Sequence, residues 1–335
     1  MNWLGIDIGG ANLKLADGKG YATERSFPLW KTPDRLADVM ADMFLAAPHT
    51  DAVAITMTGE LADCFATKAE GIRHILASLE QVAGERSLHV YQTGGSFLSV
   101  EDALDQPHAV AAANWHALAS WASRSLPTPS GLLIDIGSTT TDIIPITPEG
   151  VSARGETDTE RLALGELVYS GVRRTAVATL ISEVPYRGGM CALARESFAT
   201  THDVYLTLGQ IEEDPQDCDT ADFRPATRSA AHRRLARMLC GDVAEIDARD
   251  VQAIAAATRA AQLQTVRMAL ERICSQHGKP GTALISGSGE FLTRDLLRDW
   301  QPELSIISLG NCDRLPVSQC APAHALAILA RETFE

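Results

Sequence analysis

Two aspartates in this chain each begin a short glycine-containing segment of a kind that can hold a phosphate group and a metal ion. Residues 7–14 read DIGGANLK, and residues 135–142 read DIGSTTTD. Glycine lets backbone amides approach an anion closely, and Mg²⁺ takes one or two protein carboxylates, here Asp7 and Asp135. Lys14 can reach a phosphate as a point charge. The plainer interpretation of either segment alone is a glycine hairpin with a capping aspartate.

Most of the candidate phosphate-binding residues belong to these two segments. The hydroxyl groups of the second segment can donate hydrogen bonds to phosphate oxygens, although successive threonines also suit a plain strand. We expect phosphate or substrate binding at Gly9, Gly10, Asn12, Lys14, Gly137, Ser138, Thr139 and Thr140.

A third glycine-rich segment follows an apolar run near the end of the chain. Residues 283–285 predict a strand, and residues 286–289 read SGSG and open a predicted helix. Helix N-termini favour anions, and glycine permits close approach by a ligand ring or ribose. We therefore add Gly287, Ser288 and Gly289 to the candidate site.

The elements that position these segments form an internal repeat. Both aspartates lie in the sequence Ile-Asp-Ile-Gly at the end of an apolar run, and a second predicted strand follows at 12–16 and at 141–146. A repeat on this scale indicates two similar lobes. The turn-rich segment 126–131 marks the boundary, so we expect an N-terminal lobe at 1–128 and a C-terminal lobe at 129–335. Asp7 and Asp135 should then face each other across a cleft.

The remaining pattern is one of alternating strands and helices, which indicates α/β architecture. Further strands are predicted at 51–56 and 88–91. Helices are predicted at 70–83, 109–123, 160–180 and 251–277. Residues 209–228 are acidic, contain two prolines and predict a loop or small insertion.

Composition limits the possible partners and compartments. The chain has 335 residues and a formal net charge of −14, which argues against a nucleic-acid-binding surface. No apolar run is long enough to predict a membrane span, and the N-terminus lacks the pattern of a signal peptide. The seven cysteines are scattered without a C-x-x-C pair, as is typical of reduced thiols. We expect a cytoplasmic protein with small-molecule substrates, and the sequence leaves open whether it forms a homodimer.

In this order, the three glycine-rich segments resemble the phosphate-1, phosphate-2 and adenosine loops of the actin/sugar-kinase/Hsp70 superfamily. The resemblance spans nearly the whole chain. It implies a two-lobed α/β fold of the ribonuclease H-like type with a central cleft.

Four further segments resemble a narrower family, at residues 56–65, 110–115, 196–205 and 234–239. They look like the hydantoinase/oxoprolinase-related proteins of the tetrahydromethanopterin-linked C1-transfer pathway. Archaeal members are methanofuran-biosynthesis synthases, which join gamma-glutamyltyramine to an aminomethylfuran methyl diphosphate, form an ether and release diphosphate. The resemblance implies a transferase that uses Mg²⁺ and does not require ATP.

Under that reaction, Asp7 and Asp135 serve as metal ligands or as the base, and Glu60 is an alternative base. Thr58 and Gly59 join the substrate-binding residues, although Thr58 to Glu60 can equally begin a helix. Arg173 and Arg174 can clamp an anion or can be solvated. Asn114, Glu196 and Asp203 suit structural roles: Asn114 as a buried amide, and Glu196 and Asp203 as caps or surface carboxylates, with substrate binding by Glu196 or Asp203 as the alternative.

Two other functions remain open on the sequence. An ATP-dependent kinase or ATPase fits the superfamily loops, with Asp142 as the available catalytic aspartate. A non-enzymatic scaffold or sensor is disfavoured, because it does not need two phosphate-binding segments.

Overall fold

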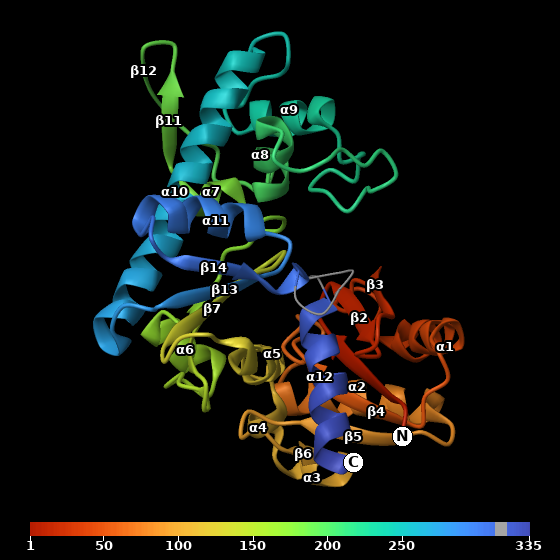
Figure 1. The fold of residues 1–335 in the computed structure, drawn as a ribbon. Helices are drawn as coiled ribbons and strands as arrows, with labels where there is room; N and C mark the ends of the chain where they lie inside the picture. The colour runs from red at the N-terminus through yellow and green to blue at the C-terminus, as the bar shows by residue number, and fades with distance from the viewer. Residues whose placement is uncertain (312–319) are drawn as a thin grey trace.

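The computed structural model describes residues 1–311 and 320–335, which form two lobes, each built on a six-stranded sheet (Figure 1). The strand order is β3-β2-β1-β4-β5-β6 in the first sheet and β10-β8-β7-β13-β14 in the second, where β9 also pairs with β8. The first sheet contains β1 (Trp3–Ile8), β2 (Asn12–Ala16), β3 (Ala22–Ser26), β4 (Ala52–Met57), β5 (Ser87–Tyr91) and β6 (Phe97–Leu98). The second contains β7 (Gly131–Ile136), β8 (Thr141–Thr147), β9 (Gly150–Val151), β10 (Leu167–Val168), β13 (Thr282–Ser286) and β14 (Ser305–Ser308).

The helices lie around these two sheets (Figure 1). Those before the second sheet are α1 (Leu36–Ala46), α2 (Lys68–Ala83), α3 (Val100–Asp105), α4 (Pro107–Val110) and α5 (Asn114–Ala122). The later ones are α6 (Asp158–Leu164), α7 (Val177–Leu180), α8 (Thr201–Leu208), α9 (Arg228–Arg237), α10 (Ala248–His277), α11 (Glu290–Trp300) and α12 (Ala321–Phe334). A separate hairpin consists of β11 (Glu183–Tyr186) and β12 (Gly189–Ala192). No helix of the described ranges has the length and apolar character to cross a bilayer.

The internal repeat is present in the backbone geometry. The first strand of each repeat pairs antiparallel with the next strand and parallel with a later one, β4 or β13. Asp7 lies opposite Lys14, and Asp135 lies opposite Asp142 in the same register. The Gly9 amide donates to the Asn12 carbonyl at 2.9 Å, and the matching amide of Gly137 donates to Thr140 at 2.9 Å. The two turns therefore have the same construction, as the repeat predicts.

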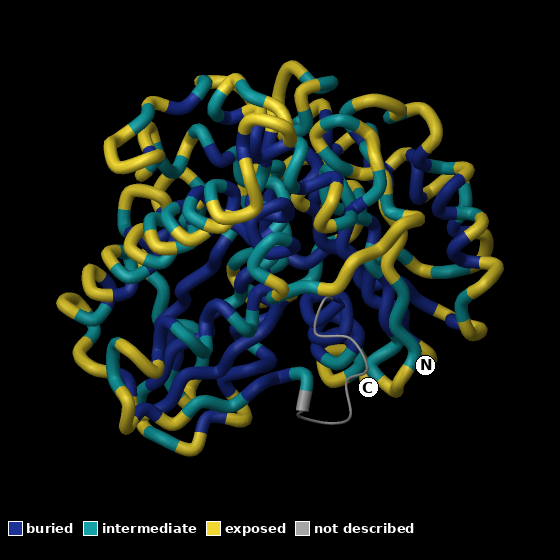
Figure 2. The backbone as a smooth tube through the Cα atoms, turned by 90° about the horizontal axis from the view of Figure 1, so that it is seen from above, coloured by how far each residue is buried: buried dark blue, intermediate teal, exposed yellow. Residues whose placement is uncertain are grey.

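Apolar packing fixes the two lobes and the region where they meet. In the first lobe, side chains of β1 and β4 pack against α1 and α2. In the second, those of β7 and β13 pack against α10 and α11. A third cluster contains Trp3 and Leu133, one from each sheet, together with side chains of α5 and α12. Figure 2 shows that buried backbone fills the interior and that exposed segments lie mostly along the outside.

The last helix returns to the first lobe. A β-carbon added at Gly5 of β1 would lie 1.9 Å from the Ala323 carbonyl oxygen of α12, so only glycine permits this approach. The division expected at residue 128 separates the two sheets, but the C-terminal part of the chain also supplies a helix that packs on the first sheet.

Two expected helices are interrupted in the structure. In the 109–123 segment, Ala111 forms a parallel bridge with Met57 and Ala112 has φ 48°, so the chain divides into α4 and α5. In the 160–180 segment, Gly165 ends α6 with φ 86°, and β10 then pairs with β8. The first interruption accompanies pairing with a distant strand, which overrides local helix propensity, and the second begins at a glycine in the left-handed conformation, which commonly ends a helix.

Candidate functional site

A cleft of about 460 Å³ lies between the two repeated turns. Most of the predicted site residues line it: Asp7, Gly9, Gly10, Asn12, Lys14, Thr58 and Glu60 from the first lobe, and Asp135, Gly137, Ser138, Thr139 and Thr140 from the second. The two aspartates of the repeat therefore face one cavity, as predicted. Asn114, interpreted from the sequence as a structural amide, also lines it.

An adjoining cavity of about 280 Å³ shares part of this lining. Lys14 and Asp135 contribute to both cavities, and the third glycine-rich segment contributes Gly287 and Ser288 to the smaller one. The three predicted loops thus meet around one connected space.

Gly59 and Gly289 line neither cavity and instead allow close packing behind the turns. A β-carbon at Gly59 would lie 2.7 Å from Leu29 Cδ2, and one at Gly289 would lie 2.4 Å from Ile136 Cγ2. The backbone amides of Thr58 and Gly59 both donate to the carbonyl of Ile8, at 2.9 and 3.0 Å. These contacts bring the turn that carries Glu60 to the end of β1.

Three carboxylates in the cleft, the buried Asp7 and Glu60 and the half-buried Asp135, each have an oxygen without a hydrogen-bond partner. Asp7 is 3% exposed and Glu60 is 1% exposed. The unpartnered atoms are Asp7 Oδ1, Glu60 Oε2 and Asp135 Oδ1. Unpartnered buried atoms also occur elsewhere in the described ranges, but three carboxylate oxygens gathered in one cavity suit the binding of a ligand.

Burial also changes the protonation of these groups. It raises the pKa of Asp7 to about 6, although the nearby Lys14 ammonium opposes the shift. Burial, reinforced by the charge of Asp142, raises the pKa of Asp135 to about 7. Burial raises the pKa of Glu60 to about 7. All three carboxyl groups therefore change charge near neutral pH, which is a property of functional sites.

The cations of the cleft are largely matched by acidic neighbours. Burial lowers the pKa of Lys14, but the charges of Asp7, Glu24 and Asp135 outweigh it, and the net shift is upward. Arg161 is buried, forms ion pairs with Asp142 and Asp158, and stacks 4.2 Å from the Trp115 ring centroid.

Asp142 and Arg161 were not among the sequence-predicted binding residues of the synthase. The repeat could have indicated Asp142, because it occupies the position of Lys14 in the second copy. No signal in the sequence pointed to Arg161.

The donor set suits a hydrated divalent cation. No group of three or more metal-ligating side chains is present in the described ranges 1–311 and 320–335. Mg²⁺ needs only one or two carboxylates and keeps several waters, and Asp7 and Asp135 each offer an unpartnered oxygen. The larger cavity is lined by more acidic than basic side chains. The six acidic ones are Asp7, Glu60, Asp63, Asp135, Asp142 and Asp158, and the three basic ones are Lys14, Arg161 and Arg174. Without a cation this lining would repel an anionic ligand.

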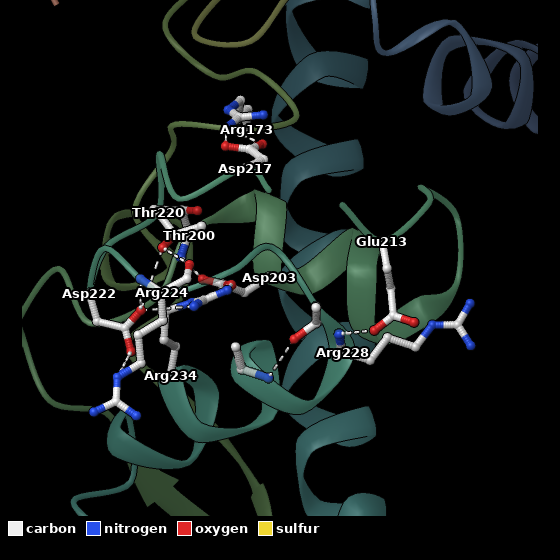
Figure 3. Close-up of polar contacts among 12 residues, drawn as sticks. Arg173, Thr200, Asp203, Glu213, Asp217, Thr220, Asp222, Arg224, Arg228 and Arg234 are labelled. Atoms are coloured by element: carbon white, nitrogen blue, oxygen red, sulfur yellow. Dashed lines mark hydrogen bonds and ion pairs between the residues drawn. The ribbon is translucent and has the colours of Figure 1, made fainter. Parts of the chain in front are cut away.

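The other sequence candidates divide between the cleft and the rest of the second lobe. Asp203 is buried in α8, where it caps the helix and pairs with Arg234, and Glu196 is exposed. Arg173 lines the smaller cavity and pairs with Asp217 (Figure 3). Arg174 lines the larger cavity.

Comparison with known proteins relates this site to a family. A model of hydantoinase/oxoprolinase matches residues 51–331. A protein of Methanocaldococcus jannaschii named "(4-{4-[2-(gamma-L-glutamylamino)ethyl]phenoxymethyl}furan-2-yl)methanamine synthase" is 35% identical over 335 residues, covering 99% of this chain and 98% of that protein. A protein of the same name from Methanococcus vannielii is 32% identical over 202 residues, covering 60% of this chain and 90% of that protein.

Solved structures relate the fold. A nucleotide-free acetone carboxylase structure has a TM-score of 0.50 at 11% identity and covers 98% of this chain and 70% of that chain. A glucokinase of the ROK family from Streptomyces griseus has a TM-score of 0.49 at 14% identity, covering 99% and 100%. With the topology of the two sheets, the first likeness confirms the two-lobed actin/sugar-kinase/Hsp70-like fold. From the family match and the full-length relative, the chain belongs to the hydantoinase/oxoprolinase family.

Proposed function

We propose that this protein joins the phenol of gamma-glutamyltyramine, or of a close analogue, to an aminomethylfuran methyl diphosphate. The phenolic oxygen forms a bond to the furan methylene carbon. The bond from that carbon to the diphosphate oxygen breaks, and its electron pair leaves with diphosphate. The phenol proton passes to a base, so the products are the aryl ether, diphosphate and one proton. The protein is thus a transferase of methanofuran-type cofactor biosynthesis, consistent with its full-length relative.

The observation that carries the proposal is the set of three carboxylates between two glycine turns, each with a buried oxygen that has no hydrogen-bond partner in the described ranges. Leaving such groups unpaired costs stability, so the arrangement favours a function that uses them. Loss of a diphosphate from carbon needs compensation of the growing negative charge.

The two turns suit the diphosphate end of the donor. The backbone amide of Gly10 and the hydroxyls of Ser138 and Thr139 can donate to its oxygens, while the amides of Gly9 and Gly137 close the two turns. Asp7 and Asp135 would hold Mg²⁺, which supplies further neutralisation of the leaving diphosphate when bound. The ATP-binding apparatus of the fold is thereby used without ATP.

A carboxylate in the cleft assists the nucleophile. A phenol has an unperturbed pKa near 10, and a base with a pKa near the working pH transfers protons most effectively. Burial raises the pKa of Glu60 to about 7, and Glu60 lies in the same cleft. Glu60 is therefore our first choice of base, ahead of the aspartates that the metal would occupy.

The compartment also follows from this proposal. The six cysteines of the described ranges are all free thiols. Free thiols are typical of a reducing compartment, so we propose a cytoplasmic enzyme.

The test is a direct assay with purified protein, gamma-glutamyltyramine, the furan diphosphate and Mg²⁺, without ATP. Ether and diphosphate should form in equal amounts. Product that appears only when ATP is supplied, or ATP hydrolysis with no ether, would contradict the proposal and favour a kinase or ATPase.

A further inference from the structure

Two consecutive arginines, Arg173 and Arg174, are held beside the turn of the second lobe by one backbone carbonyl group. The backbone amides of Arg173 and Arg174 both donate to the Ser138 carbonyl, at 3.0 and 2.9 Å. Their side chains have different partners, and this difference separates a structural arginine from a candidate for ligand binding.

Arg173 is occupied within the protein. Its Nη2 donates to both carboxylate oxygens of Asp217, at 2.9 and 2.7 Å, and to the Asp219 carbonyl at 3.1 Å. Figure 3 shows this pair at one end of the network that holds the 209–228 segment, with Arg234 bonded to Asp203 and Asp222 at the other. Arg173 therefore tethers this segment.

Arg174 reaches the first lobe instead. Its guanidinium carbon lies 4.5 Å from the centroid of the Trp30 ring, and both side chains line the larger cavity. Within the described ranges no carboxylate pairs with Arg174, whereas the two other basic side chains of this cavity, Lys14 and Arg161, have acidic neighbours. A guanidinium stacked on an aromatic face keeps its N–H groups free to bind a carboxylate with two parallel hydrogen bonds.

The surroundings of Arg174 suit an aromatic ligand with an acidic tail. Leu61 is 62% exposed and Tyr169 is 69% exposed, yet both line the same cavity as Trp30. Exposed apolar side chains grouped in a cavity mark a site for an apolar ligand group. The cavity thus combines the two phosphate-binding turns with apolar side chains and one unmatched cation.

We propose that Arg174, stacked on Trp30, binds the carboxylate of the acceptor's glutamyl tail and makes the enzyme select gamma-glutamyltyramine over tyramine. This inference rests on the proposed function. It assigns the acceptor's aryl ring to the apolar part of the cavity and leaves the turns to the diphosphate donor.

The test compares the two acceptors in wild-type protein, Arg174→Gln and Arg174→Lys. A lost charge-assisted pair weakens binding by about 10- to 100-fold. In Arg174→Gln, the ratio of kcat/KM for gamma-glutamyltyramine to that for tyramine should fall by about this factor, through KM. Arg174→Lys should recover part of it, since lysine keeps the charge but not the planar pair of donors. Arg298→Gln, on the exposed surface of α11, is the matched control and should keep the wild-type ratio.

Calorimetric binding of gamma-glutamyltyramine separates failure of this inference from failure of the proposed function. Wild-type binding that Arg174→Gln weakens supports the subsite even if no ether forms, in which case the reaction alone is wrong. Equal binding and equal acceptor ratios in wild type and Arg174→Gln would overturn the subsite while ether formation still supports the reaction. A wild-type protein that does not bind this acceptor contradicts both.

Discussion

Buried carboxylates occur in two regions of this molecule, and their surroundings are opposite. In the second lobe, Asp203 is 1% exposed, and both of its oxygens are bonded, one to Arg234 Nε at 2.7 Å and the other to the Thr200 amide at 3.0 Å. In the cleft, Asp7 and Glu60 are similarly enclosed and Asp135 is half-buried, but each has an oxygen without a hydrogen-bond partner in the described ranges.

The difference separates a group that holds the fold from groups that await a ligand. Burial raises the pKa of Asp203, and the bonds to Arg234 oppose that shift. Within the described ranges no arginine pairs with the three cleft carboxylates, and burial raises the pKa of each. The cleft carboxylates therefore lack the ion pair that offsets part of the cost of burying Asp203.

The largest expected effect comes from breaking the paired region. Arg234→Met leaves two carboxylates, Asp203 and Asp222, without their buried cation. Removing one partner from a buried ion pair costs about 3–5 kcal/mol, and urea unfolding at pH 7 should show a loss of this size. Arg298→Met, an exposed change, is the control and should stay within about 0.5 kcal/mol of wild type. A loss below about 1 kcal/mol for Arg234→Met would contradict the claim that the ion pairs of Arg234 stabilise the fold.

Neutralising a carboxylate of the cleft should instead raise the free energy of unfolding at pH 8. Glu60 has a folded pKa of about 7, above its ordinary value of 4.5. The folded state then binds more protons than the unfolded state between these values, so wild-type stability falls as pH rises from about 4.5 to 7. Glu60→Gln should therefore be more stable than wild type at pH 8, by about 1–3 kcal/mol, and no more stable at pH 4. Parallel urea titrations at the two pH values would measure this, and a variant less stable than wild type at pH 8 would contradict it.

A smaller effect is expected for metal removal. If Asp7 and Asp135 need a cation before an anion can enter, inorganic diphosphate should bind at least about 10-fold more weakly in EDTA than in Mg²⁺, because the metal offsets the acidic lining. Calorimetry on one preparation provides the comparison. Equal affinity in both buffers would assign diphosphate binding to the turns and Lys14 alone.

The repeat made much of the fold and site predictable from sequence. Ile-Asp-Ile-Gly appears twice because each copy builds the same strand, turn and strand, and local sequence is enough to specify such a unit. The repeat also predicts the cleft, because two such lobes place their turns on edges that face each other. Twelve of the fourteen other phosphate- or base-site positions line one cavity or the other, and Gly59 and Gly289 support the turns from behind.

What the sequence did not reveal depends on contacts between distant residues. Arg161 meets Asp142 across 19 positions, and Arg174 meets Trp30 across the two lobes. The break near Ala112 likewise accompanies a bridge to Met57 that local periodicity does not encode, whereas the break at Gly165 lies at a glycine that the sequence shows. The sequence does not distinguish Arg173 from Arg174 as the anion-binding residue. The ion pair between Arg173 and Asp217 does so, because it leaves Arg174 as the candidate.

Asp135→Asn provides the most direct test of the claim that the cleft gives up stability for catalysis. The substitution keeps the shape of the side chain and removes its charge. Turnover and the free energy of unfolding should be measured on the same preparation at pH 8. We predict turnover lower by about 100-fold or more, as expected when a main electrostatic element is removed, with stability equal to or above that of wild type. A near-wild-type rate with intact folding would show that Asp135 only caps its turn, and the account of the cleft would be wrong.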